Sequence, residues 1–198
     1  MSSGDAPGGR ARDLLWQAWD EPGLEHLTLH SDAGGVWADG VMLGLHGSRR
    51  VRVRYLIRCD PAWRVREVRV EADALPARVL DLLSDGAGRW QFRDGETIPA
   101  LDECLDVDLY ASAFTNTLPI RRLQLDPGGA AEIRVAYIAL PGLELTPAHQ
   151  RYTLLARNTA ESHWRYEGLG TDFVQEIRVD HEGLVLEYPR VARRLVTA

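Results

Sequence analysis

Alternation of apolar and polar residues is the feature that most limits the folds open to this chain. In segment 51–59, VRVRYLIRC, every second residue from Val51 to Cys59 is apolar or a cysteine, whereas Arg52, Arg54 and Arg58 lie on the opposite face. A period of two residues is that of a β-strand with one buried face. Similar short segments separated by Gly and Pro turns recur along the chain. This pattern predicts a mainly β fold with a many-stranded antiparallel sheet.

Turn residues set the expected limits of these strands. Asp39-Gly40 is typical of a two-residue hairpin, so we expect it to break the apolar segment 36–46. Tyr188-Pro189 is expected to end the last strand, leaving a short Arg-rich tail. The predicted strands cover residues 14–20, 24–30, 36–46, 51–59, 63–70, 78–84, 89–92, 104–109, 133–140, 151–157, 163–168, 173–180 and 184–188.

The chain is expected to form a single domain over residues 14–198. Residues 1–13 are small, polar and Gly-rich, which is typical of a disordered tail. Two pairs of segments resemble each other, 54–58 with 151–157 and 66–71 with 175–180, which indicates a possible internal duplication of a strand unit.

Composition excludes several classes of function. The net charge is −6, and all 23 basic residues are arginines. An acidic chain of this kind is not expected to bind nucleic acid or anionic membranes, which require basic patches. No segment approaches the roughly 20 apolar residues of a membrane span. Cys59 and Cys104 have no metal-ligand spacing, which favours a reduced, cytoplasmic protein over one with a structural disulfide.

Asp106 and Asp108 are the first candidates for chemistry. They lie two residues apart in the strand segment 104–109, on the same face, so their backbone anchors are about 6.6 Å apart. That separation suits a carboxylate pair for glycoside hydrolysis, or two oxygen ligands for a hard cation. Alternatively, the two carboxylates pair with Arg121 and Arg122, or face solvent. The sequence favours the structural pairing, and leaves contact with a ligand open.

A short helix is expected near residues 115–122. Thr115, Asn116 and Thr117 are good N-terminal caps, and Pro119 is tolerated only in the first turn of a helix. Either a helix begins here, or one from Ser112 ends before the proline. In a protein rich in sheet, an isolated helical segment is a natural plug for the concave face. The adjacent Arg121 and Arg122 could contact a phosphate or sugar hydroxyls, and Asn116 could join them.

Arg89 and Trp90 follow a Gly-rich turn at 86–88. The turn lacks the Lys-Ser/Thr pair and the following helix of a phosphate-binding loop. Guanidinium planes and aromatic faces both pack on sugar rings, so the two residues could line a ligand surface; Trp90 could equally be core. Hydrolase motifs such as GxSxG and HExxH are missing, and no cofactor or metal site is predicted.

Eight segments together resemble the putative glycolipid-binding family of spiral β-roll proteins. The string FTNTLPIRRL at 114–123 is the most specific of them, and Ala113 stands before it where the family would have a proline. The resemblance implies a sheet wound as a spiral β-roll around a single helix, similar to bacterial lipoprotein-carrier folds, in a homodimer. It transfers no catalytic residue. The matching segments are 23–27, 55–68, 84–90, 104–109, 114–123, 151–155, 177–189 and Arg193 or Arg194.

Taken with the resemblance, the sequence favours non-catalytic binding of an amphipathic ligand, such as a glycolipid or lipid, in a concave sheet. One alternative is a structural or dimerisation module with a satisfied Asp–Arg network and no ligand. A sugar-active enzyme using Asp106 and Asp108 is the third. The residues expected to meet the polar part of a ligand are Arg89, Trp90, Asp106, Asp108, Asn116, Arg121 and Arg122.

Overall fold

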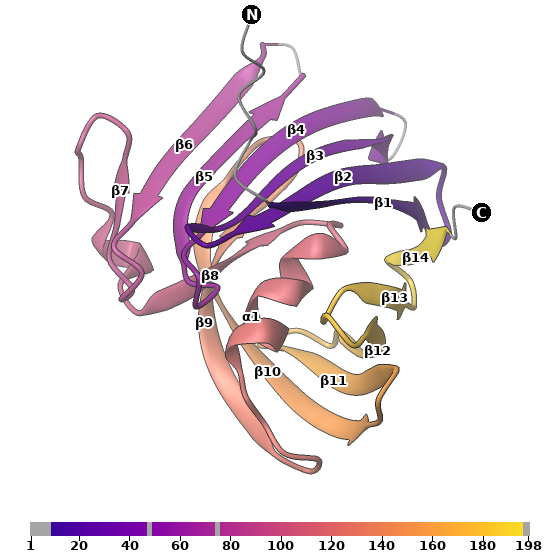
Figure 1. Cartoon of the computed structure of the whole chain (residues 1–198). Coiled ribbons are helices and arrows are strands. Elements are labelled where there is room, and N and C mark those ends of the chain that lie inside the picture. Colours follow the sequence, from indigo (N-terminus) through magenta and orange to yellow (C-terminus); the bar gives the residue numbers. More distant parts are fainter. Residues whose placement is uncertain (1–8, 47–48, 74–75, 196–198) are drawn as a thin grey trace, which may run out of the picture.

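A single curved sheet of 14 strands wraps around one short helix, α1 (Thr117–Arg122) (Figure 1). The computed structural model describes residues 9–46, 49–73 and 76–195. The expected mainly β roll around a single helix is therefore confirmed. Three-residue 3₁₀ turns, η1 (Pro99–Leu101) and η2 (Phe114–Asn116), flank the strand β8.

The strands, in chain order, are β1 (Arg10–Ala18), β2 (Gly23–Asp32), β3 (Gly35–His46), β4 (Arg49–Cys59), β5 (Val65–Ala72), β6 (Arg78–Ser84), β7 (Trp90–Phe92), β8 (Cys104–Leu109), β9 (Ala130–Ile138), β10 (Leu145–Arg157), β11 (Glu161–Leu169), β12 (Val174–Asp180), β13 (Val185–Tyr188) and β14 (Ala192–Leu195).

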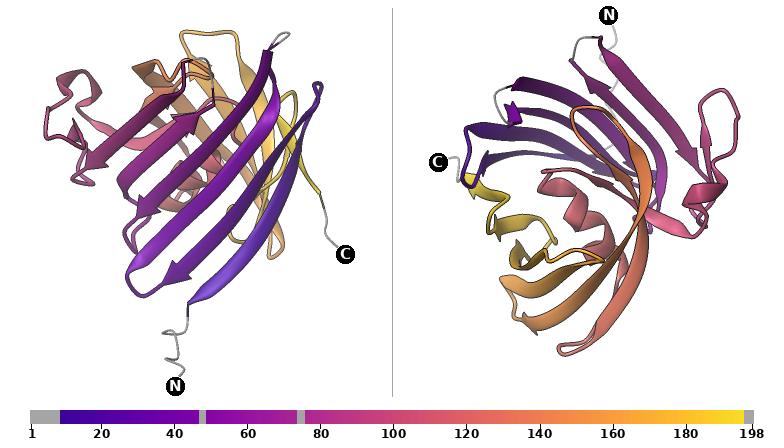
Figure 2. Two further views of the ribbon diagram at one scale, coloured as in Figure 1. Left: turned by 90° about the horizontal axis from the view of Figure 1, so that it is seen from above. Right: turned by 180° about the vertical axis from the view of Figure 1, so that it is seen from behind.

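The strand order places the first and last strands side by side in the middle of the sheet. The order runs from β7 through β1, then from β14 back to β8. β1 pairs antiparallel with β14, and Leu15 lies opposite Leu195. The two halves of the sheet curve toward each other from this seam and face each other across α1 (Figure 2).

One pair of neighbouring strands departs from the expected antiparallel arrangement. β8 and β9 are parallel. The chain between them passes through η2 and α1, and parallel pairing requires a crossover connection of this kind. The helix therefore lies inside the roll because it is part of the connection between two neighbouring strands.

The expected hairpin at Asp39-Gly40 is wrong. Both residues lie inside β3, which continues across them and pairs with β2 and β4. Gly40 lies opposite Tyr55, and a Cβ at position 40 would overlap the Tyr55 ring. The glycine is needed because an aromatic ring lies against the backbone. Asp39 forms an ion pair with Arg54 on the outer face of the sheet, 3.0 Å long.

The first and last strands of the chain also differ from the expected ones. β1 begins at Arg10, so residues 10–13 belong to the sheet and not to the predicted tail; residues 1–8 lie outside the described ranges. The predicted Arg-rich tail after Pro189 contains β14, which completes the seam. Thr146 and Pro147, which fall between the predicted strands 133–140 and 151–157, are part of β10.

Strand order does not support the predicted duplication. The first members of the two similar pairs of segments lie in β4 and β5, which are neighbours in the sheet. Their counterparts lie in β10 and β12, which are separated by β11. The resemblance between the segments therefore does not correspond to a repeated pair of adjacent strands.

The inner faces of both halves form one apolar core around the helix. The largest fully buried side chains include Trp16, Tyr55, Phe114 and Trp164. Cys59 and Cys104 are also buried, and both are free. Among the described residues, no helix has the length and apolar character needed to cross a membrane.

Candidate functional site

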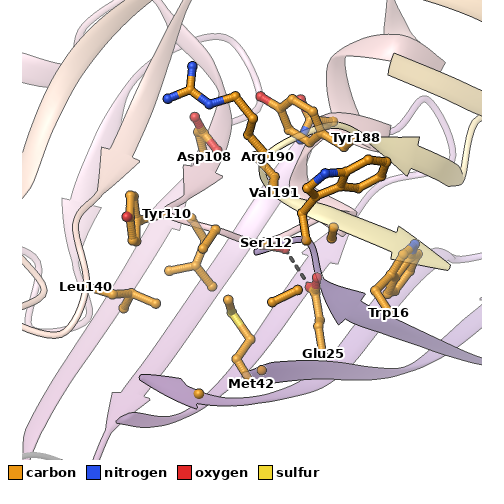
Figure 3. A pocket seen from close by; sticks show the side chains of 18 of the residues that line it. Trp16, Glu25, Met42, Asp108, Tyr110, Ser112, Leu140, Tyr188, Arg190 and Val191 are labelled. Atoms are coloured by element: carbon orange, nitrogen blue, oxygen red, sulfur yellow. Dashed lines mark hydrogen bonds between the residues drawn. The ribbon is translucent and has the colours of Figure 1, made fainter. Parts of the chain in front are cut away.

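A pocket of about 840 Å³ opens at one end of the roll, between the two halves of the sheet (Figure 3). Its wall includes the β1–β2 turn, the end of β3, the segment after β8, the ends of β10 and β11, and the β13–β14 turn. Strands from both halves contribute, and the seam between β1 and β14 supplies Trp16 and Ala192. The closure of the roll therefore shapes the pocket.

Glu25, which the sequence analysis missed, is a buried acid in the pocket lining. One of its carboxylate oxygens accepts hydrogen bonds from Tyr55 Oη (2.7 Å) and Ser112 Oγ (2.6 Å). The other oxygen accepts from the backbone N–H of Ala113 (2.6 Å). Burial raises the pKa of the carboxyl group, although these hydrogen bonds oppose the shift. Glu25 thus ties β2 to the chain that enters the helix.

The sequence contained a signal for Glu25. Leu27 and Leu29 are buried on the inner face of β2, and Glu25 lies on the same face because it is two residues earlier. An acidic residue at an inward position of an alternating strand must find hydrogen bonds or a functional role, since an unpaired buried carboxylate is costly. Following the alternation to the start of the strand would have identified it.

Asp108 is a second acid in the lining, and it is partly buried. The sequence left open whether this residue contacts a ligand or pairs with an arginine. Its carboxylate accepts hydrogen bonds from Thr115 Oγ1 (3.1 Å) and Gln150 Nε2 (2.6 Å). Burial raises its pKa, and these two hydrogen bonds oppose the shift. Neither Glu25 nor Asp108 forms an ion pair with a described residue.

Asn116 joins Asp108 in the lining through a shared network. Tyr152 Oη donates to Asn116 Oδ1 (3.0 Å), and the same hydroxyl lies 3.4 Å from Gln150 Oε1. Asn116 is 4% exposed and lines the pocket. Tyr152 thus holds the amide group of Asn116 by its oxygen at the edge of the pocket.

Aromatic rings form much of the wall. Tyr166, Phe173 and Tyr188 pack edge to face, with ring centroids 5.9–6.1 Å apart. Arg190 extends from the β13–β14 turn over Phe173, 5.6 Å from the ring centroid. Its backbone is left-handed, with φ of 65°. Arg190 is exposed and forms no ion pair with any residue that the structure describes.

The helix that carries Asn116 is positioned by its neighbours rather than by the expected caps. No side chain caps α1 or η2. Instead, Ser112 Oγ accepts a hydrogen bond from the Thr115 backbone N–H (3.4 Å) while donating to Glu25. Pro119 is the third residue of α1, where its missing N–H costs no helical hydrogen bond. Of the two helix positions considered, the one that begins here is confirmed.

Asp106 lies outside the pocket lining, in an ion pair. Its carboxylate is fully buried and meets Arg122 through two contacts, Nε–Oδ1 at 3.2 Å and Nη2–Oδ2 at 2.5 Å. The expected Asp–Arg pairing is confirmed for these two residues. Arg121 points elsewhere, over the Trp63 ring at 5.0 Å, and lines a smaller pocket of about 390 Å³.

Arg89 and Trp90 also lie outside the larger pocket. The Arg89 side chain is 78% exposed, and Asp102 is 3.6 Å from it. Trp90 is buried and donates from its indole nitrogen to the Cys104 carbonyl oxygen (2.7 Å). Of the seven predicted contact residues, the structure brings Asp108 and Asn116 together in the pocket lining, and places the other five outside it. Within the described ranges, no group of three or more His, Cys, Asp or Glu residues is arranged to hold a metal ion.

Comparisons with known proteins agree with this architecture. The family model described as "Putative glycolipid-binding" matches residues 13–194. A crystal structure of a DUF1089 family protein from Pseudomonas aeruginosa is similar, with a TM-score of 0.80 and 38% sequence identity, and the match covers 91% of this chain and 95% of that chain. No curated protein matches the chain. By its family match over nearly the whole sequence, the chain belongs to the putative glycolipid-binding family.

Proposed function

We propose that this protein binds an amphipathic ligand, such as a glycolipid, without catalysing a reaction on it. The observation that supports the proposal is the pocket of about 840 Å³, which combines aromatic walls with buried polar groups. Its volume lies in the range of about 300–1,000 Å³ that is usual for small-molecule sites. The description of the family points in the same direction.

The placement of the aspartates supports binding over the sugar-active enzyme that the sequence left open. That enzyme would need Asp106 and Asp108 to face a common substrate. Asp106 is fully buried against Arg122 and does not line the pocket, whereas Asp108 does. The two carboxylates therefore have separate surroundings, which is unfavourable for a catalytic pair.

A purely structural or dimerisation module is the second candidate. The satisfied pair of Asp106 and Arg122 favours it, because that pair connects the helix to β8 without any ligand. The pocket argues against it as the whole function, since side chains do not fill the roll. The homodimer and the cytoplasmic location stay part of the proposal; the first rests on family resemblance and the second on the two free cysteines.

Native mass spectrometry of protein purified from its own host tests the proposal. We expect a bound lipid or glycolipid that organic extraction releases and that Asn116→Ala, in the pocket lining, no longer retains. Arg89→Ala, an exposed position outside the lining, is the matched control and should retain the ligand. A wild-type protein that carries no ligand and takes up none from a total lipid extract would favour the structural module.

A further inference from the structure

The smaller pocket, of about 390 Å³, lies at the opposite end of the roll from the larger one. The larger pocket is lined by the end of β11 and by Asn116, which directly precedes α1. The smaller pocket is lined instead by the start of β11, the last residues of α1, and the β10–β11 and β12–β13 turns. Among the described residues, the two pockets share no lining side chain, and α1 lies between them.

Both acids that line the smaller pocket are already paired with arginines. Glu161 forms an ion pair with Arg178 (2.8 Å), whose hydrogen bond holds the pKa of Glu161 below its ordinary value. Asp180 forms ion pairs with Arg194 (2.7 Å) and Arg12 (3.6 Å). The negative charge of each carboxylate is therefore balanced within the protein.

Arg121 and Arg157 also line this pocket, and they are left over from that balance. In the part of the chain that the structure describes, neither guanidinium forms an ion pair or a hydrogen bond. The pocket is therefore locally positive, although the chain as a whole has a net charge of −6. The surrounding network of ion pairs is balanced, with the arginines Arg10, Arg12, Arg178 and Arg194 against the acids Glu161, Asp180, Glu182 and Glu187.

Arg121 is held in position without using its N–H groups. Its guanidinium lies over the Trp63 ring, 5.0 Å from the ring centroid. Its alkyl stem lies close to Gly183, where an added Cβ would come within 3.0 Å of Arg121 Cδ. A guanidinium over an aromatic ring keeps the N–H donors in its plane available to an anion. Because the side chain is already positioned, it loses little freedom when it binds one.

Ser162 adds a neutral donor to the same pocket. Its side chain is buried, and its Oγ accepts a hydrogen bond from the Trp164 indole nitrogen (2.9 Å). A hydroxyl that accepts in this way can still donate its own hydrogen. Arg157 lines the pocket from the end of β10 and is exposed. The pocket thus combines a positioned arginine, an exposed arginine and a buried hydroxyl, each of which can donate to an anion.

We propose that the smaller pocket is a second binding site, which takes a phosphate group, either free or as the monoester of a small molecule. Guanidinium groups match phosphate oxygens with paired N–H donors. A tetrahedral phosphate also presents oxygens in more directions than a planar carboxylate, which suits donors that come from α1, β10 and β11. The sequence favoured Arg121 and Arg122 for such contacts. The site keeps Arg121 and has Arg157 in place of Arg122, which pairs with Asp106.

NMR titration of the full chain at constant ionic strength tests the site with glycerol 3-phosphate, inorganic phosphate and glycerol as probes. We expect glycerol 3-phosphate to bind more tightly than glycerol by at least about tenfold, because only the ester accepts charge-assisted hydrogen bonds. Inorganic phosphate that binds as tightly as the ester would identify free phosphate as the ligand, and weaker binding would identify a monoester. Glycerol binding as tightly as its phosphate, or no binding of either phosphate at millimolar concentration, would overturn the proposal.

Variants assign the binding to the smaller pocket. Arg121→Met and Arg157→Gln should each weaken glycerol 3-phosphate binding by about tenfold, the usual effect of losing a hydrogen bond to a charged group. Arg190→Gln, which changes an exposed arginine of the larger pocket, is the matched control and should leave the dissociation constant unchanged. Weakening in Arg190→Gln alone would place the anion in the larger pocket. Equal weakening in all three variants would indicate general charge attraction, and either result would overturn the proposal.

Discussion

Asp106 and Asp108 lie two residues apart on β8, and their carboxylates are compensated in different ways. Asp106 is fully buried, whereas Asp108 is partly buried. Asp106 is neutralised by a two-contact ion pair with Arg122. Asp108 receives only neutral donors, Thr115 and Gln150, and borders the pocket. Burial raises the pKa of both carboxyl groups, and the hydrogen bond and charge of Arg122 oppose the shift at Asp106.

The difference distinguishes an acid with a structural role, Asp106, from an acid that can still accept hydrogen bonds, Asp108. An ion pair buried with good geometry is costly to break and satisfies its own hydrogen bonds. A carboxylate held by neutral donors keeps acceptor capacity, and it is not matched by a positive charge. The sequence LDVDL presents the two aspartates as equals, and only the surroundings of β8 distinguish them.

The largest effect is expected when the ion pair is broken from its arginine side. Arg122→Met leaves the fully buried Asp106 without a cation and should lower the free energy of unfolding by about 3–5 kcal/mol. Urea denaturation followed by tryptophan fluorescence measures the change. Arg121→Met is the matched control, because Arg121 only covers the Trp63 ring and should cost about 0.5–1 kcal/mol. Equal losses in the two variants would contradict a structural role specific to Asp106 and Arg122.

A second prediction disturbs the pocket acids through the backbone. In Gly40→Ala the added methyl group would overlap the Tyr55 ring, whose hydroxyl donates to Glu25. We expect a loss of about 1–3 kcal/mol in unfolding free energy, as for other overpacked sites. Ligand retention should fall as well, since Tyr55 can no longer hold Glu25 in place.

Tyr55→Phe is the companion variant for Gly40→Ala. It removes the hydroxyl but keeps the ring against the glycine. Ligand loss in Gly40→Ala combined with full retention in Tyr55→Phe would show that ring position, and not the hydrogen bond to Glu25, shapes the pocket.

The pH dependence of the free energy of unfolding should distinguish Asp108, whose pKa is raised in the folded protein, from an acid whose pKa is lowered. Burial raises the pKa of Asp108 in the folded protein, so the folded state binds more protons than the unfolded chain between the two pKa values. The free energy of unfolding therefore falls as the pH rises from about 4, the ordinary pKa of an aspartate. Asp108→Asn removes that loss, so the variant should gain stability relative to the wild type as the pH increases.

Asp85 supplies a control of opposite sign. Backbone N–H groups of Arg89 and Ala87 hold the pKa of Asp85 below its ordinary value. Its contribution is present above the unfolded pKa and is lost as the pH falls through the folded one. Asp85→Asn should therefore lose stability relative to the wild type as the pH rises. Tyr137, which faces Asp108, has a pKa raised by burial to about 12 and does not titrate in this range. If the stability of Asp108→Asn and of Asp85→Asn, each relative to the wild type, changed with pH in the same direction, the opposite pKa shifts assigned to the two acids would be contradicted.

The smallest effect is expected at Arg89. Its side chain is exposed, and its contact with Asp102 is 3.6 Å long. Arg89→Ala should change the free energy of unfolding by no more than about 0.5 kcal/mol, and should leave ligand binding unchanged. A clear loss of ligand would instead restore the sequence-based expectation that this residue meets a head group.

Much of the fold could be predicted because alternation and turn chemistry are local. Segment 78–84 was predicted as a strand, and β6 has the same limits. Asp39-Gly40 misled the prediction because a glycine next to an aspartate is typical of a turn, whereas this glycine accommodates a ring from a neighbouring strand. The strand β14 was missed because Pro189 ends a strand locally, and because its pairing with β1 is a contact between the first and last strands of the chain.

The candidate site was only partly predictable for a similar reason. Asp108 and Asn116 come from one short segment, so their proximity could be inferred from the sequence. Glu25 lies 87 residues before Ser112 in the sequence, and only the closed roll brings the two residues together. The ring cluster of Tyr166, Phe173 and Tyr188 likewise depends on neighbouring strands. Arg190 reaches the pocket from a turn in which its own backbone is left-handed, and no local sequence pattern predicted that conformation.

The seam between β1 and β14 has a consequence for synthesis of the chain. Ribosomes make a protein from its N-terminus, so Leu15 emerges long before its partner Leu195. Until then β1 has an open edge on the side that β14 will occupy, and exposed strand edges invite pairing with other chains. The roll can therefore close only after β14 has been translated. Chaperone protection during that interval would matter most for β1. A circular permutant, in which a linker joins β14 to β1 and the chain begins at a distant hairpin, would remove this delay.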